Sequence, residues 1–152
     1  MVALPIGKME LKCGKPKSYD YPADPKTVGD HVRRRRLDLG QVQADVAKKI
    51  GVTESSIWNW EKGGFEPELR YLPSIIAFLG YDPRPEPVTL PARLVWFREG
   101  KGWSQKRLAA ELHVDPTTLA RWERGERQPT GSFAWIVAEI VGVGSDHGRG
   151  YA

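Results

Sequence analysis

Two stretches of this 152-residue chain repeat each other at a constant spacing of 62 residues. Residues 27–81 align without a gap on residues 89–143, and eleven of the 55 aligned positions are identical. The identities include the motif Trp-Glu-x-Gly followed four residues later by proline, which begins at Trp60 and again at Trp122. Self-similarity at a fixed period is the mark of a duplicated structural unit. We therefore predict two small domains of one fold in tandem.

The composition narrows the class of protein further. Hydrophobic residues make up 40% of the chain and charged residues 28%, which is typical of a globular protein, and the formal net charge is +4. No apolar run approaches the ~20 residues that a membrane-spanning helix needs, and the first residues do not form a signal peptide. The single cysteine, Cys13, excludes an internal disulfide framework and a zinc site with two thiolate ligands. We expect a cytoplasmic protein with no membrane contact and no bound metal or cofactor.

Each copy is predicted to form four short helices, so the expected fold class is all-α. Thr27 is suited to cap a first helix that ends near Leu39, before Gly40. In the second copy Asp115 is suited to cap the third helix, with Pro116 at the first helical position. The other helices are expected at residues 43–50, 54–62 and 69–79, with counterparts in the second copy that include 105–112 and 133–141.

Three segments lie outside the two copies. Residues 1–26 contain five lysines against three acidic residues and are expected to form a basic arm or a disordered segment. Residues 82–88 carry proline at every second position, which favours an extended proline-rich linker of roughly 22 Å at ~3.1 Å per residue. Residues 144–152 are expected to form a flexible tail. The predicted domains are therefore residues 27–81 and residues 89–143.

A helix, a three-residue turn and a second helix in each copy predict a helix-turn-helix, whose second helix enters the major groove of DNA. The residues of this motif, 43–63 and 104–129, resemble the lambda-repressor-like family, also called the Cro or XRE type. The resemblance extends over 110 of the 152 residues. It implies two tandem four-helix domains that bind double-stranded DNA and a transcriptional regulator of bacterial or phage type, in the first instance a repressor.

The resemblance also implies which residues meet DNA. The glutamine that opens the second helix, Gln43 or Gln105, is expected to contact a phosphate and to brace the recognition helix. The start of the third helix is expected to meet base edges, and the residues after it are expected to meet phosphates. The expected base contacts are Thr53, Glu54, Ser55 and Asn59 in the first copy and Asp115, Pro116, Thr117 and Arg121 in the second, and the expected phosphate contacts are Lys62, Arg124 and Arg127.

Other prominent residues fit a structural role better. Trp60 and Trp122 lie on the apolar faces of their helices and are expected in the two cores. The four arginines at residues 33–36 point in different directions on a helix and are expected on a solvated face. Trp58 faces away from the core, so it is a candidate surface for a protein partner. The family usually pairs an arginine of the first helix with a glutamate of the third, which implies the semi-buried ion pairs Arg36–Glu61 and Arg98–Glu123.

Two assemblies and two functions remain open. Neither copy shows a fifth helix for dimerisation, so one chain can act as a pseudo-dimer that reads two different half-sites, and a homodimer is the alternative. The residues favour sequence-specific binding of both copies to double-stranded DNA. The alternative is an interaction adaptor, such as an antitoxin or a phage or defence-system regulator, in which only the second copy binds DNA. No nucleophile–base constellation, phosphate-binding glycine loop or metal cluster indicates an enzyme.

Overall fold

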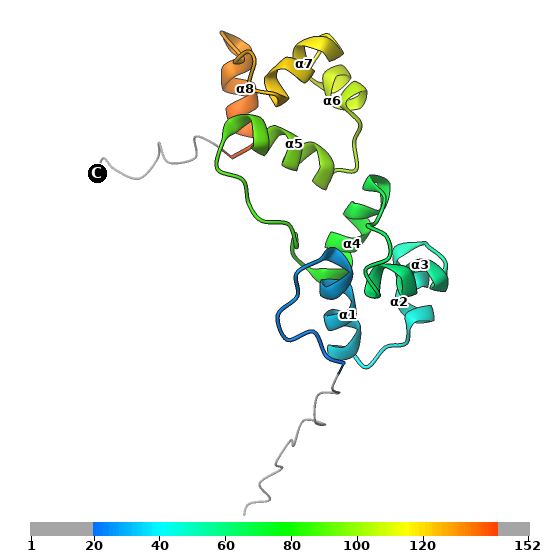
Figure 1. Cartoon of the computed structure of the whole chain (residues 1–152). Coiled ribbons are helices and arrows are strands. Elements are labelled where there is room, and N and C mark those ends of the chain that lie inside the picture. The colour runs from blue at the N-terminus through cyan, green and yellow to red at the C-terminus, as the bar shows by residue number, and fades with distance from the viewer. Residues whose placement is uncertain (1–19, 143–152) are drawn as a thin grey trace, which may run out of the picture.

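The computed structural model describes residues 20–142 (Figure 1). In this part of the chain all regular secondary structure is helical. The predicted basic arm up to residue 19 and the predicted tail from residue 144 lie outside the described residues. The all-α fold class is confirmed. The elements in chain order are α1 (Val28–Asp38), α2 (Gln43–Ile50), α3 (Glu54–Glu61), the 3-10 helix η1 (Leu69–Tyr71), α4 (Leu72–Leu79), α5 (Leu90–Gly100), α6 (Gln105–Glu111), α7 (Pro116–Glu123) and α8 (Ser132–Ile140).

The helix ends fall where local sequence signals predict them. The Thr27 hydroxyl accepts a hydrogen bond from the Asp30 amide at 3.1 Å, and the Asp30 carboxylate accepts one from the Thr27 amide at 3.0 Å, so a capping box begins α1. Gly40 follows α1 with a φ of 62°, a conformation that favours glycine. Asp115 caps α7, and Pro116 is its first residue. Predicted and observed ends differ by at most one residue, except at the fourth helix of the first copy, where residues 69–71 form η1 and α4 begins at Leu72.

Each group of four helices encloses its own core. Trp60 and Trp122 are buried, as predicted, and the turn residues Val52 and Val114 pack partly buried against the cores. Every buried residue of the second core aligns with a buried residue of the first, 62 positions earlier. The buried residues are Val32, Val46, Ala47, Ile50, Ile57, Trp60, Ile75 and Leu79 in the first core and Leu94, Leu108, Ala109, Leu119, Trp122 and Val137 in the second.

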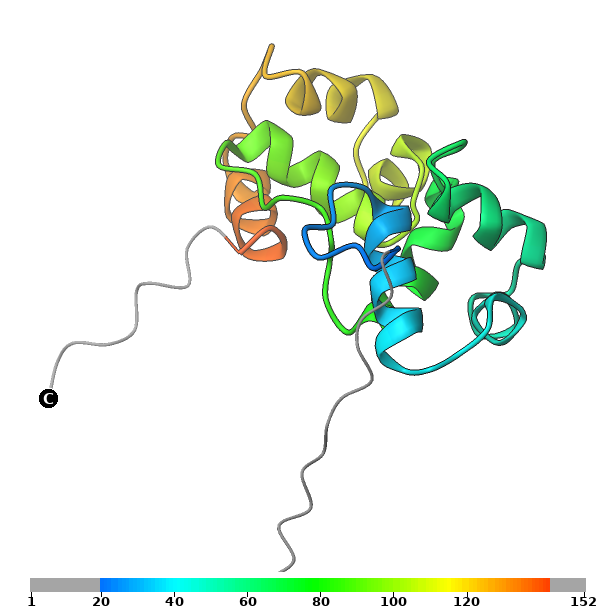
Figure 2. The same ribbon diagram turned by 60° about the horizontal axis from the view of Figure 1, so that its bottom comes forward.

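The two groups contact each other where the end of α5 meets the start of α4 (Figure 1), and Figure 2 shows the same two groups turned by 60°. The connecting residues 82–88 run alongside α5, and the Arg93 guanidinium of α5 donates a hydrogen bond to the Pro87 carbonyl at 3.0 Å. Residues 20–26 run alongside α1 in a similar way, and Arg34 of α1 donates a hydrogen bond to the Ala23 carbonyl at 3.4 Å. We name residues 20–26 the first strap and residues 82–88 the second strap.

Gly29 allows α1 and α3 to approach closely. A Cβ atom added to Gly29 would lie 1.8 Å from the carbonyl oxygen of Trp60 and 2.4 Å from its carbonyl carbon. The aligned residue in the second copy is Pro91, which carries a Cβ atom. The helices α5 and α7 therefore cannot approach each other at this point as closely as α1 and α3 do.

The substitution Gly29→Ala is expected to lower the free energy of unfolding by about 1–3 kcal/mol, because the new methyl group meets backbone atoms of a filled core. Gly64→Ala is the matched control, since its added Cβ would lie 3.6 Å from the nearest atom, the Asn59 carbonyl oxygen. Urea denaturation followed by circular dichroism measures both variants. Equal stability of the two variants would contradict the importance of the close approach.

Candidate nucleic-acid interface

One buried glutamate ties α1, α2 and α3 together. The Glu61 side chain is 3% exposed, and its carboxylate accepts hydrogen bonds from Arg36 Nε at 2.6 Å and Arg36 Nη2 at 2.7 Å. Gln43 Nε2 donates to the same carboxylate at 2.9 Å, and Arg36 Nη1 donates to the Gln41 carbonyl at 3.3 Å. Three donors from two other helices therefore satisfy the buried charge at the end of the recognition helix.

The second copy repeats this network. Glu123, also 3% exposed, accepts hydrogen bonds from Arg98 Nε at 2.7 Å and Nη2 at 3.2 Å, and from Gln105 Nε2 at 2.7 Å. Arg98 Nη1 donates to the Trp103 carbonyl at 3.0 Å. Both predicted ion pairs are confirmed. The two glutamines make hydrogen bonds that brace the recognition helices, whereas their contact with a phosphate stays a prediction.

The structure gathers the predicted base-contacting residues on the outward sides of α3 and α7, opposite the cores. Asn59 is the only half-buried member of this set. The predicted phosphate-contacting residues follow on the same outward side. The exposed members are Thr53, Glu54, Ser55 and Lys62 in the first copy and Asp115, Pro116, Thr117, Arg121, Arg124 and Arg127 in the second.

Two of these residues already serve as helix caps. Thr53 Oγ1 accepts a hydrogen bond from the Ser56 amide at 3.2 Å and lies 2.9 Å from the Ser56 hydroxyl. The Asp115 carboxylate accepts a hydrogen bond from the Thr117 amide at 2.8 Å, which holds the pKa of Asp115 below its usual value. Asp115 is therefore ionised at neutral pH, so it suits the N4 donor of cytosine and repels a phosphate.

The cations of the second copy differ in their availability to DNA. Arg124 donates two hydrogen bonds to Glu126, at 2.6 Å and 3.0 Å, and this pairing raises the pKa of Arg124 and lowers the pKa of Glu126. Such an exposed pair is weak and can open when a phosphate competes for the arginine. Among the described residues, none forms a hydrogen bond or ion pair with the guanidinium of Arg121 or Arg127. These two arginines are therefore the members of the predicted set in the second copy that have no competing carboxylate partner among the described residues.

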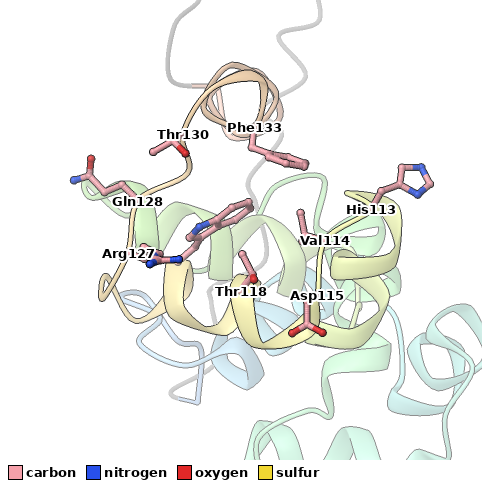
Figure 3. A pocket seen from close by; sticks show the side chains of 9 residues that line it. His113, Val114, Asp115, Thr118, Arg127, Gln128, Thr130 and Phe133 are labelled. Carbon is pink, nitrogen blue, oxygen red and sulfur yellow. The ribbon is translucent and has the colours of Figure 1, made fainter.

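A hollow of about 350 Å³ lies between α7 and the segment that leads to α8 (Figure 3). Asp115 and Thr118 line it from α7, Arg127 and Gln128 line it from the following segment, and Phe133 lines it from α8. Figure 3 shows Asp115 and Arg127 toward opposite ends of α7. The positive charge therefore lies at the end of the recognition helix, where a phosphate contact is predicted.

The outward side of the first copy carries apolar side chains that the second copy lacks. Trp58 is 51% exposed and lies four residues from both Glu54 and Lys62, so it shares their face of α3. Val42 and Phe65 are also exposed. Sequence analysis found Trp58 but not these two, although the alignment of the copies carries the signal. The residues aligned with Val42, Trp58 and Phe65 are Ser104, Ala120 and Arg127.

Two of the four arginines at residues 33–36 contact the first strap, which the expectation of a solvated face does not include, while Arg36 forms its predicted ion pair. Arg33 forms an ion pair with Asp20, and Arg34 donates to the carbonyl of Ala23, both in the first strap. The last arginine of the run belongs to the buried network at the end of α3. The strap covers this side of α1, a contact that the spacing of arginines within one helix could not reveal.

Both halves of the chain have the geometry of a helix-turn-helix protein, with a braced recognition helix that is exposed on one side. A model of the helix-turn-helix family, Cro/XRE type, matches residues 32–85 and again residues 94–147. The chain therefore belongs to this family and contains two copies of its domain. Members bind DNA and are typically regulators without enzymatic activity. No curated protein and no solved structure gives a significant match to the chain.

Residues 20–142 also bear on other classes of site. No group of three or more His, Cys, Asp or Glu side chains in that range is placed to hold a metal ion. The helices in the same range are too short or too polar to span a membrane. The candidate site consists of the outward sides of α3 and α7.

The substitution Arg98→Ala is expected to lower the free energy of unfolding by about 3–5 kcal/mol, because it leaves the buried Glu123 carboxylate without its cation. Arg107→Ala is the matched control, since Arg107 pairs with Glu111 on the surface. Its effect is expected to stay within about 1 kcal/mol. Chemical denaturation of both variants provides the comparison, and a small effect of Arg98→Ala would show that the network does not hold the helices.

Proposed function

We propose that the chain is a transcriptional repressor that binds two adjacent half-sites of double-stranded DNA in the major groove. The helix α3 reads one half-site and α7 reads the other. The observation that carries the proposal is the presence of two complete units in one chain, each with an exposed recognition helix and its own buried Arg–Glu–Gln network. One chain then acts as a pseudo-dimer on chromosomal DNA in the cytoplasm.

The two half-sites are expected to differ in sequence. The helix α3 presents Glu54 and Asn59, whose side chains suit cytosine N4 and the N6/N7 edge of adenine. At the aligned positions α7 presents Pro116, which has no hydrogen-bond donor, and Arg121, which suits the O6/N7 edge of guanine. An operator that both helices read is therefore not a palindrome.

The second copy is expected to contribute more of the affinity. Binding to the DNA backbone depends on cations that neutralise phosphates. Along the recognition helix and the segment after it, the first copy offers one cation and the second copy offers three. The aligned residues are Asn59, Lys62 and Phe65 in the first copy and Arg121, Arg124 and Arg127 in the second.

Selection of binding sites from random DNA, followed by footprinting on the selected site, tests the proposal. One chain is expected to protect two adjacent and dissimilar half-sites. The stoichiometry of the complex, measured by its mass in solution, is expected to be one chain per duplex. Protection of a single half-site by a monomer would contradict the proposal, and two chains per duplex would support a homodimer instead.

The substitution Arg121→Ala is expected to weaken binding to the selected site by about 1–3 kcal/mol and to relax specificity at one base pair, because it removes a base contact. Lys62→Ala is the comparison. It is expected to weaken binding to all sequences alike and to reduce the salt dependence, because it removes a phosphate contact. Fluorescence anisotropy titrations on the selected site and on its single-base variants, at several salt concentrations, measure both. Equal losses on every sequence for Arg121→Ala would argue against base readout.

One observation favours a second candidate function, in which the first copy binds a protein. Its outward side exposes Trp58 and Phe65 beside the acidic Glu54. Aromatic side chains are enriched in the cores of protein–protein interfaces, whereas an acidic residue is repelled by phosphates. In this candidate function only α7 reads DNA, and the chain is an adaptor, such as an antitoxin or a phage or defence-system regulator.

Two double variants of the full chain separate the two functions. Asn59→Ala with Lys62→Ala alters the outward side of the first copy, and Arg121→Ala with Arg127→Ala alters that of the second. If both copies read DNA, each double variant loses affinity and its footprint shrinks to the half-site of the unaltered copy. If the first copy binds a protein, the first double variant binds DNA like the wild type.

A further inference from the structure

The second strap begins one full repeat after the first strap. Both straps have aspartate at the first position, Asp20 and Asp82, and proline at the sixth, Pro25 and Pro87. The match at a spacing of 62 residues extends back through Asp20 to Tyr19, which aligns with Tyr81. We take residues 20–81 as the first unit, and the second unit follows it without any residue between them. The segment that the sequence predicts as a linker is the leading part of the second unit.

Arg84 holds the second strap against α5. Its side chain is 16% exposed, and Nη1 donates to Glu99 Oε2 at 3.0 Å while Nη2 donates to the Trp96 carbonyl at 2.9 Å. Nε and Nη2 also donate to Oδ1 and Oδ2 of Asp82, at 3.1 Å and 2.8 Å. The guanidinium lies 5.3 Å from the centre of the Trp96 ring. These contacts use the planar fork of an arginine, which a lysine does not have.

The end of the first unit is anchored as well. The Tyr81 hydroxyl lies 2.8 Å from His31 Nδ1 on α1, and the two rings meet edge to face with their centres 5.7 Å apart. Asp82 follows directly in the chain and is held by Arg84. The free chain between the anchored residue of the first unit and the anchored residue of the second is therefore a single peptide bond.

The two units also touch directly. Gly102 lies in the turn after α5, and a Cβ atom added there would lie 3.1 Å from Pro73 Cγ and 3.3 Å from the Leu69 carbonyl oxygen. We call the contacts of Arg84 with Asp82, Trp96 and Glu99 the clamp. Gly100 leaves room for the clamp, since a Cβ atom added to Gly100 would lie 3.1 Å from Arg84 Nη2. Small residues at the end of α5 thus allow both the contact with the first unit and the contact with the strap.

The clamp is not a feature that both units share. Arg84 aligns with Pro22 in the first strap. The residues aligned with its partners Trp96, Glu99 and Gly100 are Arg34, Leu37 and Asp38. The clamp therefore belongs to the second unit alone, at the junction where one unit follows another.

We propose that Arg84 is a positioning residue for DNA binding, which fixes α7 relative to α3 and thereby sets the spacing of half-sites that the chain accepts. This inference rests on the proposed reading of two half-sites by one chain. An insertion of ~5 base pairs rotates one half-site by half a helical turn to the other side of the duplex. A rigid pair of recognition helices cannot follow that rotation, whereas two loosely joined units can.

The first test is a series of selected sites with zero to ten base pairs inserted between the half-sites. The wild type is expected to lose about 10²-fold in affinity when half a turn is inserted, because only one unit then binds. Arg84→Ala and Arg84→Lys are expected to lose less than about tenfold across the same series. Glu86→Gln, which alters an exposed residue of the same strap, is the matched control and is expected to behave like the wild type.

The second test measures the junction without DNA. Backbone ¹⁵N relaxation is expected to give one rotational correlation time for both units of the wild type and of Glu86→Gln. In Arg84→Ala the two units are expected to show shorter and unequal times. Joint tumbling of the units in Arg84→Ala, or an unchanged spacing profile, would overturn the proposal.

Arg84→Ala leaves the carboxylates of Asp82 and Glu99 without their partner, and this loss can unfold the second unit. A further variant therefore tests the junction with the contacts of Arg84 intact. Insertion of Gly-Ser-Gly-Ser after Tyr81 keeps every contact of Arg84 and lengthens only the junction. It is expected to broaden the spacing profile as Arg84→Ala does, and an unchanged profile would overturn the proposal. Equal wild-type affinity for one half-site and for the full site would instead contradict the proposed function, and the spacing role with it, while the relaxation data still report on the clamp.

Discussion

A buried carboxylate that needs three donors holds each helix-turn-helix unit together. Glu61 and Glu123 end the recognition helices, and each attracts an arginine from the first helix of its unit and a glutamine from the second. A buried charge without compensation is costly, so the angle between the helices is fixed by charge as well as by packing. Trp60 and Trp122, which directly precede these glutamates, are buried in the cores. The outward sides of α3 and α7 are therefore presented by a rigid support.

Much of this fold could be predicted from the sequence because its signals are local and occur twice. The caps Thr27 and Asp115, the spacing of apolar residues and the three-residue turns each depend on a few neighbouring positions. The rest could not be predicted, because it depends on contacts between distant segments. Alternating prolines favour an extended chain, but a chain extended through solvent and one extended along α5 have the same composition. The ion pair of Arg33 with Asp20 and the clamp around Arg84 are of this second kind.

The two units combine a common interior with different exteriors. Every buried residue of the second core aligns with a buried residue of the first, whereas their outward sides differ in kind: Trp58 and Phe65 of the first unit stand where the second has Ala120 and Arg127. A duplicated scaffold can change its contact chemistry in this way without a change in its core. The modest net charge of +4 is accordingly no guide to the partner of either unit, because the arginines on and after the recognition helix, Arg121, Arg124 and Arg127, all belong to the second unit.

The contact between the units joins unlike surfaces. Pro73 of the first unit meets Gly102 of the second, whereas their counterparts are open: Trp135 is 70% exposed, and no atom lies within 4 Å of a Cβ added to Gly40. A contact between unlike surfaces has no two-fold axis, so this joint does not impose the inverted symmetry of a dimer on its operator. The contact also leaves one surface free on each unit, around Gly40 on the first and around Trp135 on the second. A third unit that joined in the same way would use one of these surfaces and leave another free.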